Sequence, residues 1–192
     1  EASYRKVSDL RYGENPHQSA ALYGAPNATP GSRVRAKQLH GKELSYNNLL
    51  DLDSALAMVR LLPTPGVVVL KHNNPCGAAT ADTVVDAIRR AWDGDPLSAF
   101  GSVLGFNVPV DKAAAEFLCE PERFVEAILA PEFTSEAFEI LTTKPKWKAN
   151  VRRLAVGKIE SGHGNSDLRQ NSGDMLCPKA GGQTRHEPRG TG

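Results

Sequence analysis

From Val67 to Val156 the chain alternates short runs of branched apolar residues with longer stretches in which apolar residues recur at helical spacing. The short runs predict strands over Gly66 to Leu70, Ser102 to Phe106, Phe124 to Leu129 and Val151 to Val156. Runs this continuous are typical of strands that helices cover on both faces. The alternation therefore predicts an α/β fold.

The helical stretches lie between these strands. Their spacing predicts helices over Thr83 to Trp92, Asp111 to Cys119 and Thr134 to Leu141. Asp82 or Thr83 can cap the first amides of the first helix, and Gly94 ends it. A Pro/Gly turn is expected between the Gly66 to Leu70 strand and this helix, which makes the segment a strand-turn-helix unit.

The segments before Val67 and after Val156 have weaker hydrophobic patterns. Leu44 to Leu62 has five apolar residues at helical spacing and predicts a helix of about three turns, with Asn48 or Asp51 as its cap. Ser19 to Gly41 is polar and predicts a loop around a short edge strand. Lys158 to Gly192 has neither period, so we predict a disordered tail there.

The composition favours one compact domain. A chain of 192 residues with 40% hydrophobic content can bury one core. Its longest apolar run is strand-sized, far below the roughly 20 residues of a membrane span. Lys and Arg total 23 against 22 Asp and Glu, so no strongly basic surface for nucleic acid is expected. We therefore expect neither a membrane nor a nucleic acid as partner.

The cysteines indicate a reducing compartment. Cys76, Cys119 and Cys177 are odd in number, far apart and without metal-ligand spacing, which does not fit a disulfide framework. The first residue is Glu1 rather than Met, so we expect the chain to start within a longer protein, and no basic-then-apolar leader follows it. The expected localisation is cytoplasmic.

Lys71 and His72 are the first candidates for chemistry, because they directly follow the most apolar predicted strand. Ligand clefts form at the carboxyl ends of strands in α/β sheets. Lysine supplies a compact positive charge, and imidazole can pass a proton near neutral pH. Both side chains can face one substrate only if the chain turns at once, and Asn73 to Gly77 predicts such a turn. For an arbitrary Lys-His pair, an exposed lysine and a hydrogen-bonded histidine at a strand end are the commoner arrangement.

Cys76 follows a proline, as does the first cysteine of the Pro-Cys-x-x-Cys motif of zinc deaminases. The second cysteine of that motif would fall on Ala79, and no His-x-Glu accompanies it. The sequence therefore argues against a zinc nucleoside deaminase. Cys76 is better interpreted as a small packed thiol than as a nucleophile.

Two further segments have the residue types of a binding site. Asp95 to Gly101 has small residues and a glycine, which let backbone amides approach a ligand, although an ordinary loop before a strand has the same pattern. Leu10 to Gln18 combines an arginine that can hold a phosphate with an aromatic ring that can stack on a heterocycle. By itself that segment equally fits a surface turn.

Together these segments resemble, in order and spacing, the AICAR transformylase domain of the AICAR transformylase/IMP cyclohydrolase family. The resemblance covers about residues 5 to 156. The matching stretches are LRYGENPHQ at Leu10 to Gln18, LHGKELSYNNLLDLDSA at Leu39 to Ala55, VVVLKHNNPCGAA at Val67 to Ala79, DPLSAFGSVLGFN at Asp95 to Asn107 and, less strictly, FVEAILAPEF at Phe124 to Phe133.

The resemblance implies a three-layer, cytidine-deaminase-like α/β subdomain without zinc. It implies transfer of a formyl group from 10-formyltetrahydrofolate to the 5-amino group of AICAR, with no metal required. Lys71 and His72 would be the catalytic pair. His72 would take the proton of the attacking amine, and Lys71 would stabilise the oxyanion or assist departure of the folate nitrogen.

The resemblance also implies a set of substrate-binding residues. Arg11 and Tyr12 would bind the nucleotide, reaching across a homodimer interface into the neighbouring active site. Phe100, Gly101 and Glu126 would line the substrate pocket.

The sequence departs from the family pattern in two places. The amino-terminal cyclohydrolase domain of the family is not in this sequence, and Lys158 to Gly192 lacks the Gly-x-Gly-Ala-Gly-Gln type of motif of the family's second deaminase-like subdomain. We therefore expect a partial transformylase domain over residues 1–157 and a disordered or unrelated tail over residues 158–192. The alternative is a folded or dimerising fragment without turnover of its own.

Overall fold

The computed structural model describes residues 3–26, 36–160, 169–170 and 175–176. The chain divides into two units, Glu1–Ser161 and Gly162–Gly192. In the second unit, β9 (Arg169–Gln170) and β10 (Met175–Leu176) pair in antiparallel fashion. Most of the tail for which disorder is predicted lies outside the described residues.

The first unit is built on a mixed six-stranded sheet with the strand order β3-β8-β7-β6-β4-β5. β6, β7 and β8 run parallel, whereas β4 is antiparallel to both of its neighbours and β3 is antiparallel to β8. The strands are β3 (Lys37–His40), β4 (Gly66–Lys71), β5 (Asn74–Thr80), β6 (Ser102–Phe106), β7 (Val125–Ala130) and β8 (Arg152–Ala155). The predicted α/β class and its four predicted strands are confirmed.

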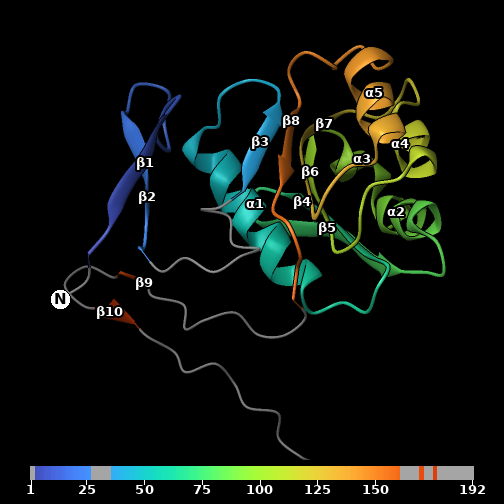
Figure 1. The fold of residues 1–192 in the computed structure, drawn as a ribbon, viewed down its shortest axis with the longest axis horizontal. Coiled ribbons are helices and arrows are strands. Elements are labelled where there is room, and N and C mark those ends of the chain that lie inside the picture. The colour runs from blue at the N-terminus through green and yellow to red at the C-terminus, as the bar shows by residue number, and fades with distance from the viewer. Residues whose placement is uncertain (1–2, 27–35, 161–168, 171–174, 177–192) are drawn as a thin grey trace, which may run out of the picture. The chain divides into compact units, whose positions relative to one another are not determined.

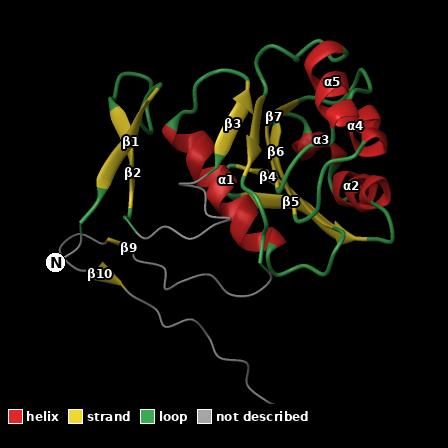
Figure 2. Ribbon diagram, viewed as in Figure 1, coloured by secondary structure: helices red, strands yellow, loops and turns green. Residues whose placement is uncertain are grey.

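Helices cover both faces of this sheet (Figures 1 and 2). Val68 and Leu70 of β4 pack on one face in a cluster with the apolar side of α1 (Tyr46–Val59). Val67 and Val69 pack on the other face, beneath α2 (Val84–Asp93), α4 (Lys112–Leu118) and α5 (Ser135–Thr143). Alternate side chains of β4 thus enter different cores, which explains why the whole run is apolar.

The predicted cap of α2 is confirmed, since Thr83 was one of its two candidates, whereas the predicted cap of α1 is wrong. Thr83, Asp111 and Thr134 each accept a hydrogen bond from the third residue beyond them, as Ncap residues do. α1, however, is capped by Ser45 and not by Asn48 or Asp51. The hydroxyl of Ser45 accepts from the amide of Asn48, and the side chain of Asn48 accepts from the amide of Ser45, so the two residues form a capping box.

The segment after β4 also differs from the prediction. Instead of a Pro/Gly turn leading into a helix, Asn74–Thr80 returns as β5 beside β4, with Lys71 opposite Asn74. β5 is an edge strand, where Pro75 loses no interior ladder bond. A further hairpin of β1 (Arg5–Leu10) and β2 (Ala20–Gly24) and the one-turn helix α3 (Pro96–Ala99) were not predicted.

Arg153 on β8 is fully buried, although no carboxylate pairs with it in any ion pair found among the described residues. Its guanidinium donates to the carbonyls of Leu141, Lys148 and Val151 and lies 2.7 Å from Nδ1 of His40 on β3. Burial lowers the pKa of Arg153 to about 10. The side chain thus ties β3 and β8 to the loop after α5.

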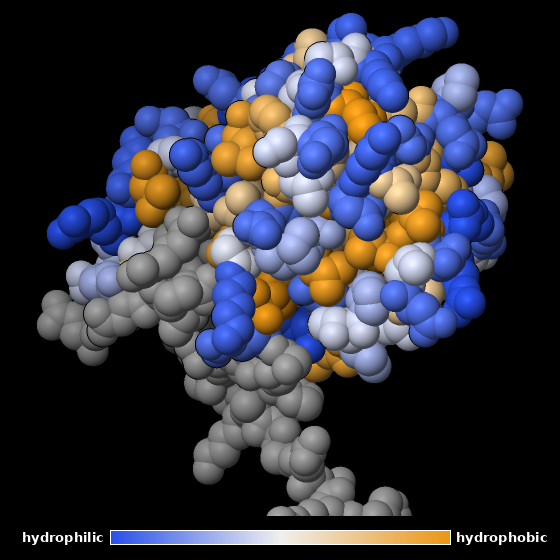
Figure 3. All heavy atoms as spheres, turned by 45° about the vertical axis from the view of Figure 1, so that its right-hand side comes forward, coloured by the Kyte–Doolittle hydropathy of each residue, from blue (hydrophilic) through white to orange (hydrophobic). Residues whose placement is uncertain are grey.

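No helix within the described residues has the length and apolar character needed to cross a membrane. On the face shown in Figure 3, hydrophilic and apolar residues are interspersed.

Candidate active site

The chain reverses at His72 and Asn73, immediately after β4. Both residues have positive φ, 52° and 61°, and they join the paired residues Lys71 and Asn74. Two consecutive positive-φ residues define the tight two-residue turn that matches strand twist in hairpins. A residue with a Cβ in this region carries a backbone cost of about 1–2 kcal/mol. The turn predicted over Asn73 to Gly77 therefore occurs earlier, and it exposes the His72 side chain at the tip.

Lys71 lies beside the segment that precedes β6. Its Nζ donates to the carbonyl oxygen of Phe100 at 2.8 Å. Gly101 adopts φ +79°, a conformation that favours glycine, and its amide donates to the Phe124 carbonyl at 2.7 Å. The rings of Phe100 and Phe124 lie 5.4 Å apart in a tilted contact. Three predicted site residues, Lys71, Phe100 and Gly101, are thus brought together.

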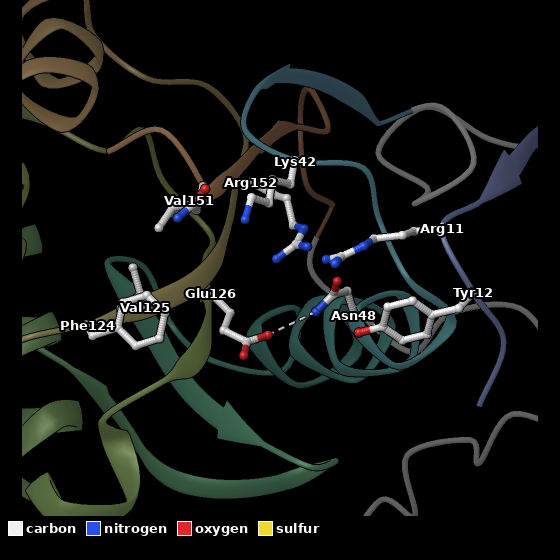
Figure 4. Close-up of a pocket in the computed structure, with 10 residues that line it drawn as sticks. Arg11, Tyr12, Lys42, Asn48, Phe124, Val125, Glu126, Val151 and Arg152 are labelled. Atoms are coloured by element: carbon white, nitrogen blue, oxygen red, sulfur yellow. Dashed lines mark hydrogen bonds between the residues drawn. The ribbon is translucent and has the colours of Figure 1, made fainter. Parts of the chain in front are cut away.

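A second group of predicted residues lines a cavity of about 220 Å³ in the same unit (Figure 4). Arg11, Tyr12 and Glu126 contribute to it, as the resemblance implies. Phe124 also lines it, so this one ring borders both the cavity and the Phe100–Gly101 segment. The other lining residues are Lys42, Asn48, Val125, Asn150, Val151 and Arg152.

Glu126 reaches this cavity through an irregularity in β7. Ser102 pairs with Val125, but Val103 pairs with Ala127, so Glu126 is an extra residue without a partner on β6. Such a bulge re-aims a side chain, and bulges are common beside active sites. The Glu126 carboxylate accepts a hydrogen bond of 3.1 Å from Nδ2 of Asn48 (Figure 4).

Asn48 therefore serves two purposes. It is buried, with 6% of its surface exposed, and its Oδ1 accepts from the amide and the hydroxyl of Ser45 while its Nδ2 holds Glu126. The capping box of α1 fixes the amide orientation that Glu126 requires. The position of the carboxylate in the cavity is thus tied to the start of the helix.

Three cationic side chains line the cavity together with Glu126. Arg152 is buried and donates twice to the Glu43 carbonyl, at 3.1 Å each. Burial lowers the pKa of Arg152, and the negative charge of Glu126 partly offsets this. Arg11 lies over the Tyr12 ring at 5.4 Å, and Lys42 completes the group. The cavity therefore combines a positive lining with one carboxylate.

Arg11 and Tyr12 are held against their own chain. The Arg11 amide donates to the Leu44 carbonyl at 3.0 Å, and the Tyr46 amide donates to the Tyr12 carbonyl at 3.1 Å. The resemblance implied that these two residues reach a neighbouring copy, and this stays a prediction. In this structure they line the same cavity as Glu126 of the same chain.

The site lies at the end of the sheet where β4 finishes, as predicted for Lys71 and His72. Lys71 ends β4, whereas Gly101, Glu126 and Arg152 lie at the starts of β6, β7 and β8. Because β4 runs against β6, its carboxyl end meets the amino ends of the parallel strands. Lys71 and His72 therefore lie at the carboxyl end of their strand, as predicted, and the antiparallel direction of β4 brings them to the end of the sheet where β6, β7 and β8 begin.

The sequence did not single out Lys42, Asn48 or Arg152 as site residues. Lys42 and Asn48 are within the matching stretch Leu39 to Ala55, where they could have been noticed. Arg152 is the second residue of the strand predicted over Val151 to Val156, and a charged residue in an apolar run is a signal of function or of buried hydrogen bonding.

Cys76 is the extra residue of a second bulge, between Leu70 opposite Pro75 and Val69 opposite Gly77. It packs against the core beneath α2, and burial raises the pKa of its thiol. This agrees with the interpretation of Cys76 as a packed thiol. Within the described part of the chain, no three His, Cys, Asp or Glu side chains are grouped so as to hold a metal ion.

Comparisons with known proteins place these residues in a family. The sequence model of the AICARFT/IMPCHase bienzyme family matches residues 1–189, and so continues past Gly157. The bifunctional purine biosynthesis protein PurH of Rhodopirellula baltica is 54% identical over 178 residues, which are 93% of this chain and 34% of that protein. PurH of Bacillus thuringiensis strain Al Hakam is 44% identical over 174 residues, 91% of this chain and 33% of that protein.

The chain thus spans about a third of the length of these curated relatives. A match of the family model over nearly the whole chain, together with the motifs around Lys71 and Glu126, leads to one conclusion. This chain belongs to the AICARFT/IMPCHase bienzyme family.

Proposed function

We propose that this chain supplies part of the centre that transfers a formyl group from 10-formyltetrahydrofolate to the 5-amino group of AICAR in purine biosynthesis. The names of the family and of its PurH relatives support purine biosynthesis. The observation that carries the transformylase assignment is the position of the Lys71–His72 hairpin tip. Lys71 contacts the Phe100–Gly101 segment. This segment adjoins the cationic cavity, because the Phe124 ring contacts Phe100 and also lines the cavity.

The cavity suits part of a nucleotide monophosphate. Arg11, Lys42 and Arg152 supply the positive charge that a phosphate needs, and guanidinium groups can bind it in a bidentate way. The Tyr12 ring offers a stacking surface for a heterocycle. The Glu126 carboxylate, held by Asn48, can accept hydrogen bonds from amino or hydroxyl groups.

The chemistry that we propose requires one proton acceptor and one positive charge. The amine of AICAR attacks the formyl carbon, and the bond from that carbon to the folate nitrogen breaks. His72 accepts the proton that the amine loses. Lys71 stabilises the developing oxyanion or donates a proton to the departing folate nitrogen. Phe100 and Gly101 line the substrate pocket in this proposal. We propose a homodimer as the assembly of the complete enzyme.

A folded part without turnover of its own is the second candidate. The length of the curated relatives favours it, since this chain spans about a third of them and further substrate ligands can lie in the rest. Formyl transfer assayed with both substrates separates the two candidates. We expect this chain alone to be at least about a hundredfold slower than an enzyme that contains both subdomains, because transition-state interactions from the second would be lacking. Comparable turnover would contradict the idea of an incomplete centre.

Arg11→Ala should weaken AICAR binding by about 10- to 100-fold, because one charge-assisted phosphate contact contributes about 1.5–3 kcal/mol. Isothermal titration calorimetry on an enzyme that contains this sequence measures the change. Arg5→Ala is the matched control, since Arg5 is an exposed arginine on the same hairpin outside the cavity lining. Equal affinities for Arg11→Ala and Arg5→Ala would remove Arg11 from the nucleotide site.

A further inference from the structure

The turn that carries His72 contacts α1 at two side chains, those of Asp51 and Ser54, and at the backbone carbonyl of Leu50. Leu50, Asp51 and Ser54 lie within one turn of that helix, next to Asn73. Oδ1 of Asp51 accepts a hydrogen bond of 2.7 Å from the amide of Asn73. This contact joins residues 22 apart in sequence, across the interface between α1 and the tip of the β4–β5 hairpin.

The side chain of Asn73 strengthens the same contact. With its amide nitrogen toward α1, it donates to Ser54 Oγ at 3.1 Å, to Asp51 Oδ1 at 3.2 Å and to the Leu50 carbonyl at 3.1 Å. On the other side of the turn, Nδ2 of Asn74 donates to the His72 carbonyl at 3.2 Å. Both sides of the strained turn are therefore tethered by side chains.

The Asp51 carboxylate is placed to accept hydrogen bonds from the two central amides of the turn, those of His72 and Asn73. In a two-residue hairpin these amides point away from the strand ladder, so they need another acceptor. Successive turn amides form a concave site for an anion. Asp51 is half-buried, and burial raises its pKa, while hydrogen bonds from the amides of Asn73 and His72 and the charge of His72 oppose that rise. Asp51 is thus in electrostatic contact with His72 as well as bonded to its turn.

We propose that Asp51 is a positioning residue for His72: its carboxylate holds the positive-φ backbone from which the imidazole projects. This inference rests on the proposed function, in which His72 accepts the proton. Asp51 itself touches neither substrate nor reacting atoms in this account. Its role is to keep the imidazole at one distance from the amine, where small displacements lower the rate strongly.

Asp51→Ala should lower kcat for formyl transfer by about 10- to 100-fold, because a charge-assisted hydrogen bond to the turn is lost. KM for AICAR should change much less, since the cavity residues stay in place. Asp51→Asn keeps an acceptor oxygen and should lose less activity than Asp51→Ala. Asp53→Asn is the control, because it removes an acidic charge from an exposed position of the same helix and should leave kcat unchanged.

A rescue variant separates positioning from general loss of structure. Asn73→Gly lowers the backbone free-energy cost of positive φ at the second turn position, where glycine is the preferred residue. In the Asp51→Ala background it should recover a large part of kcat, although it restores no contact to α1. Amide hydrogen exchange at Asn73 in the chain itself gives a readout without turnover, and Asp51→Ala should accelerate it at least about tenfold.

The outcomes distinguish this inference from the proposed function. If Asp51→Ala leaves kcat at the wild-type level while His72→Asn abolishes turnover, Asp51 is not a positioning residue and the proposed function stands. Unchanged Asn73 exchange in Asp51→Ala, or a loss of kcat that Asn73→Gly does not relieve, also overturns the inference. If neither His72→Asn nor Asp51→Ala affects formyl transfer, the proposed function fails, and the inference fails with it.

Discussion

His72→Asn should lower kcat for formyl transfer by about 100- to 10,000-fold, the range expected when a positioned proton acceptor is removed. Asparagine is a suitable replacement because it tolerates positive φ better than most residues do, so the turn at His72 and Asn73 is preserved. Steady-state kinetics with both substrates, in an enzyme that contains this sequence, measures the effect.

The control for this variant is a measurement of whether the hairpin keeps its fold. Thermal unfolding and the exchange rate of the Asn73 amide should remain close to wild type in His72→Asn, because the Asp51 carboxylate accepts its hydrogen bond from the backbone amide of Asn73. A loss of activity with both readouts unchanged assigns the effect to the imidazole. Turnover within about threefold of wild type would remove His72 from the proton-transfer step.

Gly77→Ala should destabilise the protein by about 3 kcal/mol, the upper part of the range for overpacking a core. Gly77 lies on β5 where α2 crosses closest, and an added Cβ would overlap the carbonyl group of Ala91. The overlap involves only backbone atoms of Ala91, so no flexible side chain can move to relieve it. Thermal unfolding should therefore begin about 6–12 °C lower, at about 2–4 °C per kcal/mol for a domain of this size.

Gly157→Ala is the matched control for this variant. Gly157 has φ +75°, but none of the residues that the structure describes lies within 4 Å of its Cβ position, so alanine there meets only backbone strain. The expected loss is about 1–2 kcal/mol. A Gly77→Ala protein no less stable than Gly157→Ala would show that α2 and β5 do not pack as closely as described.

Much of the fold could be predicted because its core strands are uniformly apolar. β4 and β6 are buried on both faces, so Gly66 to Leu70 and Ser102 to Phe106 stood out from their polar surroundings. The caps of α2, α4 and α5 each have a Thr or Asp directly before the apolar spacing. Local signals and tertiary packing agree at these positions.

The elements that were missed are those whose structure depends on neighbours. β5 contains a proline and a glycine and few branched residues, and it is a strand only because β4 offers a ladder on one side. The cap of α1 was misassigned because both Ser45 and Asn48 are residue types that occur as Ncap residues. In the structure the side chain of each accepts a hydrogen bond from the backbone amide of the other. The β1–β2 hairpin is largely exposed, and its alternation is weak.

The candidate site was predictable only in part, for the same reason. The resemblance identified Lys71, Arg11 and Glu126, which contact or line the site region in the structure. The bulge that turns Glu126 into the cavity depends on pairing with β6, and no single segment encodes it. Arg152 and the Asp51 contact likewise depend on segments far apart in sequence.

We propose that the Lys71–His72 tip performs formyl transfer and not the cyclohydrolase reaction that the family name also includes. The most direct test measures both reactions separately in a full-length enzyme containing this sequence, for wild type and for Lys71→Met together with His72→Asn. We predict that formyl transfer falls by at least about 1,000-fold, since a general base and a stabilising charge are both removed, while the cyclohydrolase rate stays at the wild-type level. Unchanged formyl transfer, or an equal fall in both reactions, would contradict the account.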